Sequence, residues 1–165
     1  MSECNFLLDT NILLTAYHRY YAFDLVPSFW VRLGESAEKN RWAIIDYVRD
    51  ELIRQDDQIS HWIQNKYSGQ ILDSSTHEVL RAYRKVINSV QGNEQYTPNA
   101  KQEFARIADS WIVAHGLATD LCIVTEEKFE RDVKKRVMIP NECKTHSISC
   151  INTFDFMRRI GLVRI

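Results

Sequence analysis

The fold is decided by the stretch Asn5-Phe6-Leu7-Leu8-Asp9-Thr10-Asn11, near the start of the 165-residue sequence. Its apolar run ends at an acid, and a helical pattern from Ile12 to Tyr20 follows. This order predicts a strand that runs into a capped helix. Trp42–Ile45 and Leu121–Val124 predict two more strands, and the second run is typical of a strand buried on both faces of a parallel sheet.

Helical patterns alternate with these apolar runs along the whole chain. Strands that alternate with helices predict an α/β fold of three layers, α/β/α, around a central, mostly parallel sheet. We expect one domain over residues 1–165, with a helical elaboration at about 56–98. The remaining elements expected are helices at 27–39, 46–55, 60–65, 75–90, 98–118 (with a break near Arg106) and 154–160, and short strands at Val137–Pro140 and Ser147–Ile151.

The composition limits the function classes. Hydrophobic residues make up 45% of the chain and charged residues 26%, which is ordinary for a folded globular protein and argues against intrinsic disorder. Lys plus Arg is 21 and Asp plus Glu is 22, a net charge of −1. Because a general polyanion binder works through bulk positive charge, any contact with nucleic acid must be made at a local site.

The sequence also bears on the compartment. No apolar run approaches the roughly 18–20 residues needed to cross a bilayer, so we expect no membrane association. The N-terminal region is acidic and its apolar run is short, which argues against a signal peptide. The four cysteines, Cys4, Cys122, Cys143 and Cys150, form no CxxC pair. Cys122 and Cys150 are therefore expected to be reduced core thiols of a cytoplasmic protein.

Acidic residues recur where parallel strands are expected to end, which is the edge at which open α/β sheets bind ligands. Asp9 follows the first strand, Glu51 lies one helical turn beyond the second, and Glu126 and Glu127 follow the third. Asp109 lies on the helix that leads into the third strand. No glycine forms GxGxxG or GxxxxGK[ST], which argues against the common nucleotide-binding loops.

Each acid alone has a structural explanation. Asp9 could cap a helix, Glu51 could pair with Arg54 or Gln55, and two glutamates at 126 and 127 suit a helix N-terminus. The five histidines, at 18, 61, 77, 115 and 146, are scattered and predict no Ser-His-Asp or Cys-His unit. Only the joint arrangement of the acids favours a functional site.

Four motifs carry a resemblance to a known family. Phe6–Asn11 resembles the opening of PIN-domain nucleases, and Val48–Leu52 is similar to their second element, a helix with a Glu before Leu. Ala108–Ala114 resembles the third, an Asp followed by an apolar helix, and Ile123–Phe129 the fourth. The order and spacing of all four match from about residue 5 to 160. The resemblance implies a PIN-like fold and metal-dependent cleavage of single-stranded RNA.

The resemblance also implies roles for the acids. Asp9, Glu51 and Asp109 would hold Mg²⁺ or Mn²⁺ directly or through water, because hard carboxylate oxygens suit these cations. Glu127 would assist a second metal or orient the attacking water, although the family usually has Asp there and Glu126 lies beside it. The groups expected to support the metal ligands or contact phosphate are Thr10, Asn11 and Thr125.

Carboxylates that converge raise one another's pKa, and a divalent cation resolves the conflict. Basic side chains near the motifs are candidates for the RNA backbone, although each could equally form part of a solvated face: Arg19, Arg131, Lys134, Lys135 and Arg136. Tyr17, Tyr20 and Tyr21 could stack bases or pack in the core. The resemblance further implies a toxin with a cognate antitoxin protein, and a homodimer is common in the family.

Two other functions stay open. A phosphatase of the haloacid-dehalogenase type also begins with Asp at a strand end and uses Mg²⁺, but its motif needs a second acid two residues on, where this chain has Asn11. The other is a catalytically silent PIN-like module that binds RNA or protein.

Overall fold

The computed structural model describes residues 5–162, and Cys4 lies outside them. Its centre is a five-stranded sheet in the order β3-β2-β1-β4-β5, with every neighbouring pair parallel. The prediction of a parallel α/β sheet is therefore confirmed. The strands are β1 (Phe6–Leu8), β2 (Trp42–Ile45), β3 (Gln70–Leu72), β4 (Cys122–Val124) and β5 (Cys150–Ile151).

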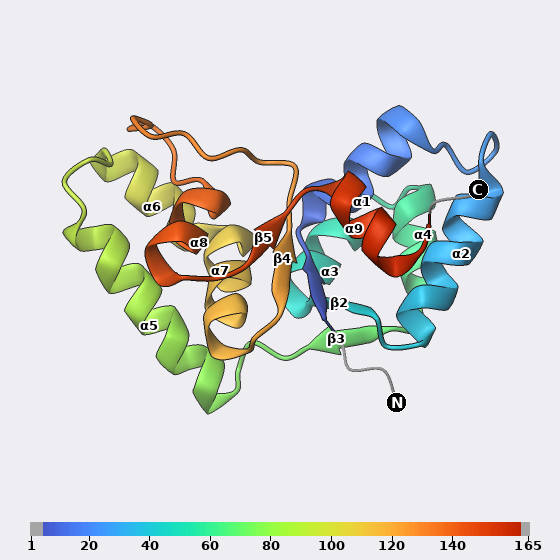
Figure 1. Ribbon diagram of the computed structural model, residues 1–165, viewed down its shortest axis with the longest axis horizontal. Helices are drawn as coiled ribbons and strands as arrows, with labels where there is room; N and C mark the ends of the chain where they lie inside the picture. Colours follow the sequence, from blue (N-terminus) through green and yellow to red (C-terminus); the bar gives the residue numbers. More distant parts are fainter. Residues whose placement is uncertain (1–4, 163–165) are drawn as a thin grey trace.

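Helices cover both faces of the sheet, which gives the expected three layers (Figure 1). On one side lie α5 (His77–Gly92), α6 (Pro98–Arg106), α7 (Ala108–Ala118) and α8 (Ile139–His146). On the other side lie α1 (Thr10–Thr15), α2 (Pro27–Glu38), α4 (Gln58–Asn65) and α9 (Thr153–Ile160). The short α3 (Asp46–Ile53) follows β2 directly, and α1 continues into the π-helix η1 (Ala16–Tyr20).

Two sequence predictions are corrected. Val137–Pro140 is not a strand, because α8 begins at Ile139 and Pro140 occupies its first turn, where the fixed φ of proline suits a helix. The segment 56–98 is not wholly helical, because β3 lies within it and pairs with β2 at the edge of the sheet. The predicted break near Arg106 is confirmed by the separate helices α6 and α7.

The burial of the strands explains why the three central strands were the clearest in the sequence, although β5 was also predicted, within Ser147–Ile151. Every residue of β1, β2 and β4 is buried, so these central strands consist of continuous apolar runs. The edge strand β3 is mostly exposed and begins with a polar residue, which leaves no comparable pattern. No helix among residues 5–162 is long and apolar enough to span a membrane.

The strand register places the candidate site. Leu8 pairs with Val124, and Val124 pairs with Ile151. The next residue along each of these three strands therefore lies at the same carboxyl edge of the sheet. Those residues are Asp9, Thr125 and Asn152.

Candidate functional site

Asp9 is held against the end of β4. Its side chain is buried, with a residue exposure of 3%, and the Thr125 hydroxyl donates a hydrogen bond to Asp9 Oδ2 at 2.8 Å. The Asp9 backbone N–H donates to the Val124 carbonyl at 3.0 Å. Asp9 occupies the N-cap position of α1 but makes no side-chain capping bond. Its carboxylate therefore contacts the end of β4 and does not cap α1.

Glu51 is brought to the same region from α3. The Thr10 hydroxyl donates to Glu51 Oε2 at 2.6 Å, across 41 residues of sequence. Thr10 is itself buried in the first turn of α1, directly after Asp9. The contact between α1 and α3 thus ties the second acid to the first, and it replaces the pairing with Arg54 or Gln55 that the helix alone suggested.

The two glutamates after β4 have different environments. The Glu127 side chain is only 5% exposed, pairs with Arg136 and accepts a hydrogen bond from the Ile139 backbone N–H at 2.7 Å. The exposed Glu126 instead accepts from the Thr153 hydroxyl on α9. Of the two glutamates, Glu127 is the one whose negative charge raises the pKa of Asp9 and of Asp109. Glu127 is therefore the better candidate for the fourth acid.

The acids perturb one another. Burial, joined by the charges of Glu127 and Glu51, raises the pKa of Asp9 from 3.8 to about 7, against the lowering effect of the Thr125 hydroxyl. Burial, joined by the charges of Asp9, Glu127 and Glu51, likewise raises the pKa of Asp109 to about 8. Arg136 is the nearby cation that lowers the pKa of Asp109. All four predicted acids thus belong to one electrostatic cluster, hereafter the acid cluster.

The donor chemistry of the acid cluster suits a hard divalent cation, because all four groups are carboxylates and one arginine does not balance them. Over residues 5–162, however, no three His, Cys, Asp or Glu side chains form a ready-made metal cage. The carboxylates therefore suit an ion that keeps part of its water shell, as Mg²⁺ does when it binds through one or two carboxylates.

Among the other predicted site residues, Thr10, Asn11 and Thr125 make hydrogen bonds within the site. Asn11 Oδ1 accepts a hydrogen bond from the Glu126 backbone N–H at 3.2 Å, which joins α1 to the end of β4. Arg19 is exposed on η1. The loop after Glu127 is anchored by the Thr97 backbone N–H, which donates to the Lys134 carbonyl at 2.9 Å. The loop residues predicted to contact the RNA backbone are all exposed: Arg131, Lys134 and Lys135.

Residues 6–163 match the model of a protein family described as Domain of unknown function (DUF4411). The chain belongs to this family. No curated protein matches the sequence of this DUF4411 chain. Its fold is similar to that of a chain in the crystal structure of VapBC2 from Rickettsia felis bound to a DNA fragment from their promoter. The match covers 89% of this chain and 97% of that chain, with a TM-score of 0.54 and 17% sequence identity, and it shows a PIN-like fold.

The structure of the DUF4411 chain also contains a polar network that the sequence did not reveal. The Ser74 hydroxyl and backbone N–H both donate to Asp46, and the Ser74 oxygen lies 2.9 Å from His115 Nε2. These residues come from the β3–α5 connection, α3 and α7, so no local spacing announces them. The hydroxyl is buried and lies between the acid and the histidine, which is not the nucleophile-base-acid order of a catalytic triad.

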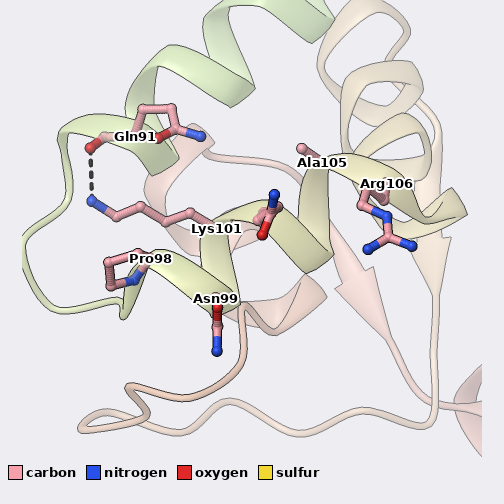
Figure 2. Close-up of a pocket in the computed structure, with 7 residues that line it drawn as sticks. Gln91, Pro98, Asn99, Lys101, Ala105 and Arg106 are labelled. Carbon is pink, nitrogen blue, oxygen red and sulfur yellow. Dashed lines mark hydrogen bonds between the residues drawn. The ribbon is translucent and has the colours of Figure 1, made fainter.

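Two surface hollows of the DUF4411 chain differ in the residues that line them. One, of about 640 Å³, lies along α5 and α6, where Lys101 Nζ donates to the Gln91 carbonyl at 2.7 Å (Figure 2). Figure 2 shows Arg106 beyond Ala105 on α6, and no acid lines this hollow. The other, of about 830 Å³, is lined by Thr125, Glu126 and Glu127 and so adjoins the acid cluster.

Proposed function

We propose that this protein is a metal-dependent endoribonuclease that hydrolyses phosphodiester bonds of single-stranded RNA. The observation that carries the proposal is the acid cluster, in which burial and mutual repulsion raise the pKa of Asp9 to about 7 and of Asp109 to about 8. Buried carboxylates with such perturbed pKa values are typical of functional sites. Their position at the carboxyl edge of a parallel sheet supports the same conclusion.

The residues divide the chemistry among them. Asp9, Glu51 and Asp109 would hold Mg²⁺ or Mn²⁺, which supplies an activated water and neutralises phosphate charge when bound. Because these acids must lose their protons first, cation affinity should rise with pH near neutrality. Thr125 fixes the orientation of Asp9, and Thr10 fixes that of Glu51.

Glu127 has a separate role in the proposed reaction. Arg136 and the Ile139 backbone N–H hold its carboxylate in place, so it can orient an attacking water without rotating away. The exposed cations Arg131, Lys134 and Lys135 follow it on one loop and would contact the RNA backbone.

We further propose that the protein acts in the cytoplasm as the toxin of a toxin–antitoxin pair, with a cognate antitoxin as its partner and a homodimer as a possible assembly. The support is the likeness of its fold to a chain of the VapBC2 complex, together with the four motifs of the PIN family. A small neighbouring reading frame that encodes a protein able to bind and silence this chain would support the pairing.

One observation favours a second candidate, a PIN-like module that binds RNA without cleaving it. The described residues present no three-donor metal cage, and a binding module needs none. The haloacid-dehalogenase alternative gains no such support, because Asn11 uses its side-chain oxygen to hold the Glu126 backbone.

Incubation of the purified protein with 5′-labelled RNA, in Mg²⁺, Mn²⁺ or EDTA, tests the proposal. We expect cleavage with either cation, none with EDTA, and none with Asp9→Asn or Asp109→Asn. Cleavage that survives these substitutions would refute the assignment. Binding without cleavage would identify the silent module, and hydrolysis of p-nitrophenyl phosphate without RNA cleavage would identify the phosphatase.

A further inference from the structure

The hollow of about 830 Å³ lies where β4 and β5 end, and we call it the β4–β5 hollow. Thr125 and Glu127 line it from the end of β4, and Asn152 lines it from the end of β5. One side of the hollow is thus shared with the acid cluster. Its volume lies within the roughly 300–1,000 Å³ that small-molecule sites occupy, which is enough for one nucleotide.

Exposed aromatic rings gather around this hollow. Tyr20 from η1 is 57% exposed, Phe129 from the loop after β4 is 47% exposed, and Phe154 from α9 is 54% exposed. Single exposed apolar residues are common on protein surfaces, but a group around one hollow marks a binding site. Three segments far apart in sequence each contribute one ring, so no single local element explains the group.

The charges around the hollow suit a strand with a phosphate backbone. Lys128 and Lys144 line it, and Lys144 Nζ lies 4.6 Å from the centroid of the Phe129 ring. Two of the acids that line it are compensated, since Glu127 pairs with Arg136 and Asp155 pairs with Arg158. The remaining acid, Glu126, accepts a hydrogen bond from the Thr153 hydroxyl.

We propose that the β4–β5 hollow binds one unpaired base of the substrate strand, next to the phosphodiester that is hydrolysed at the acid cluster. Aromatic faces stack any base, and lysines beside them contact the flanking phosphates. A base that is paired in a duplex cannot enter the hollow, so the hollow selects single strands. The inference rests on the proposed nuclease function, but it concerns how the strand is held rather than how it is cut.

Fluorescence anisotropy with a labelled single-stranded RNA of ten nucleotides, in EDTA and low salt, tests the binding step alone. Stacking is worth about 1–3 kcal/mol per base, so Phe154→Ala should weaken binding by roughly 5- to 150-fold, and Tyr20→Ala should act in the same direction. Phe154→Trp keeps a ring and should retain the affinity. Leu80→Ala is the matched control, because Leu80 is 45% exposed on α5 and does not line the hollow.

The same variants separate the two proposals. RNA binding that depends on Phe154, in a protein that cuts no RNA under any condition, would refute the nuclease and support the hollow. Metal-dependent cleavage with unchanged RNA affinity in a Tyr20→Ala, Phe129→Ala, Phe154→Ala triple variant would refute the hollow and support the nuclease. If the triple variant loses a protein partner but keeps its RNA affinity, the hollow is a protein site and the inference is wrong. Thermal unfolding of each variant checks that the fold is intact.

Discussion

Two polar clusters lie at the carboxyl ends of strands of the same sheet, and they are built in opposite ways. In the network of Asp46, Ser74 and His115, every partner is complementary, since the Ser74 hydroxyl and backbone donate to the acid and its oxygen meets the imidazole. In the acid cluster, the charges that face Asp9 and Asp109 come mainly from other acids. The Ser74 network has its hydrogen-bond partners within the protein, whereas the acid cluster lacks enough positive charge to balance its carboxylates.

The pKa shifts show the same contrast. Burial lowers the pKa of His115 to about 4, so the imidazole is neutral at physiological pH and suits a buried hydrogen bond. Burial and like charge raise the pKa values of Asp9 and Asp109 to about 7 and about 8. A buried polar network stabilises the fold when each of its polar groups has a hydrogen-bond partner. The mutual repulsion of the carboxylates destabilises the fold, so the acid cluster is better explained by the binding of a cation than by a role in folding.

The largest expected effect comes from removing charge at the acid cluster. Asp9→Asn and Asp109→Asn should each lower RNA cleavage by at least about 10²–10³-fold, the cost of losing one preorganised electrostatic contact at a reacting centre. The same substitutions should raise the Tm at pH 8 in EDTA, because they remove buried negative charge. Cleavage assays and thermal unfolding on the same preparations test both. Loss of activity together with a lower Tm would contradict the contrast between the clusters.

The next effect separates two neighbouring glutamates. Glu127→Gln should lower cleavage by about 10- to 100-fold, as expected for a group that orients a metal ligand or water. Glu126→Gln is the matched control one residue away, and we expect less than about a threefold change from it because its exposed side chain faces α9. Initial cleavage rates at saturating Mg²⁺ compare the two. If Glu126→Gln has the larger effect, the fourth acid has been assigned to the wrong residue.

The acid cluster could be predicted from the sequence because its members lie at the end of a buried strand, on the helix that follows one, or on the apolar helix that leads into one. These positions alone indicated Asp9, Glu51, Asp109 and the pair Glu126 and Glu127, and the PIN motifs gave the acids a joint role. The Ser74 network could not be predicted in this way. Its three members lie on the β3–α5 connection, α3 and α7, and β3 itself has too little apolar pattern to be recognised.

The errors in the fold have a similar cause. Val137 and Ile139 are buried, so they read as a strand, but the decisive feature is Pro140 in the first turn of α8. The β4–β5 hollow could not be predicted from the sequence, because Tyr20, Phe129 and Phe154 come together only when three distant segments fold. Local patterns thus identify strands and their final acids, while sites made by tertiary contact need the structure.

The third effect concerns the satisfied network. Ser74→Ala leaves the buried His115 without its hydroxyl partner and removes one donor from Asp46, so it should cost about 2 kcal/mol of the free energy of unfolding. Urea denaturation measures this loss, and Ser75→Ala, at an exposed neighbour, is the matched control. Cleavage per folded molecule should stay near the wild-type rate. A large loss of activity without a loss of stability would mean that the network is a reaction site.

Taken per pH unit, the smallest effect is the change in stability with pH, because the two clusters oppose each other. Between about pH 4 and 6.5 the folded protein keeps protons on Asp9 and Asp109, which destabilises it as the pH rises, while the unfolded chain keeps a proton on His115, which acts in the opposite direction. Two protons against one leave a net loss of about 1.4 kcal/mol per pH unit. From pH 6.5 to about 8 only the acids titrate, so stability continues to fall.

Thermal unfolding in EDTA from pH 4 to 9 measures this profile. Asp9→Asn combined with Asp109→Asn removes the acid contribution, so the variant should instead gain stability from pH 4 to 6.5 through His115 and then level off. Excess Mg²⁺ should restore the wild-type protein above pH 7, because an ion that binds only the folded state stabilises it by about 2.7 kcal/mol at a hundredfold excess over Kd. A profile that keeps falling in the double variant would locate the titrating groups outside the acid cluster, and the contrast between the two polar clusters would then have to be abandoned.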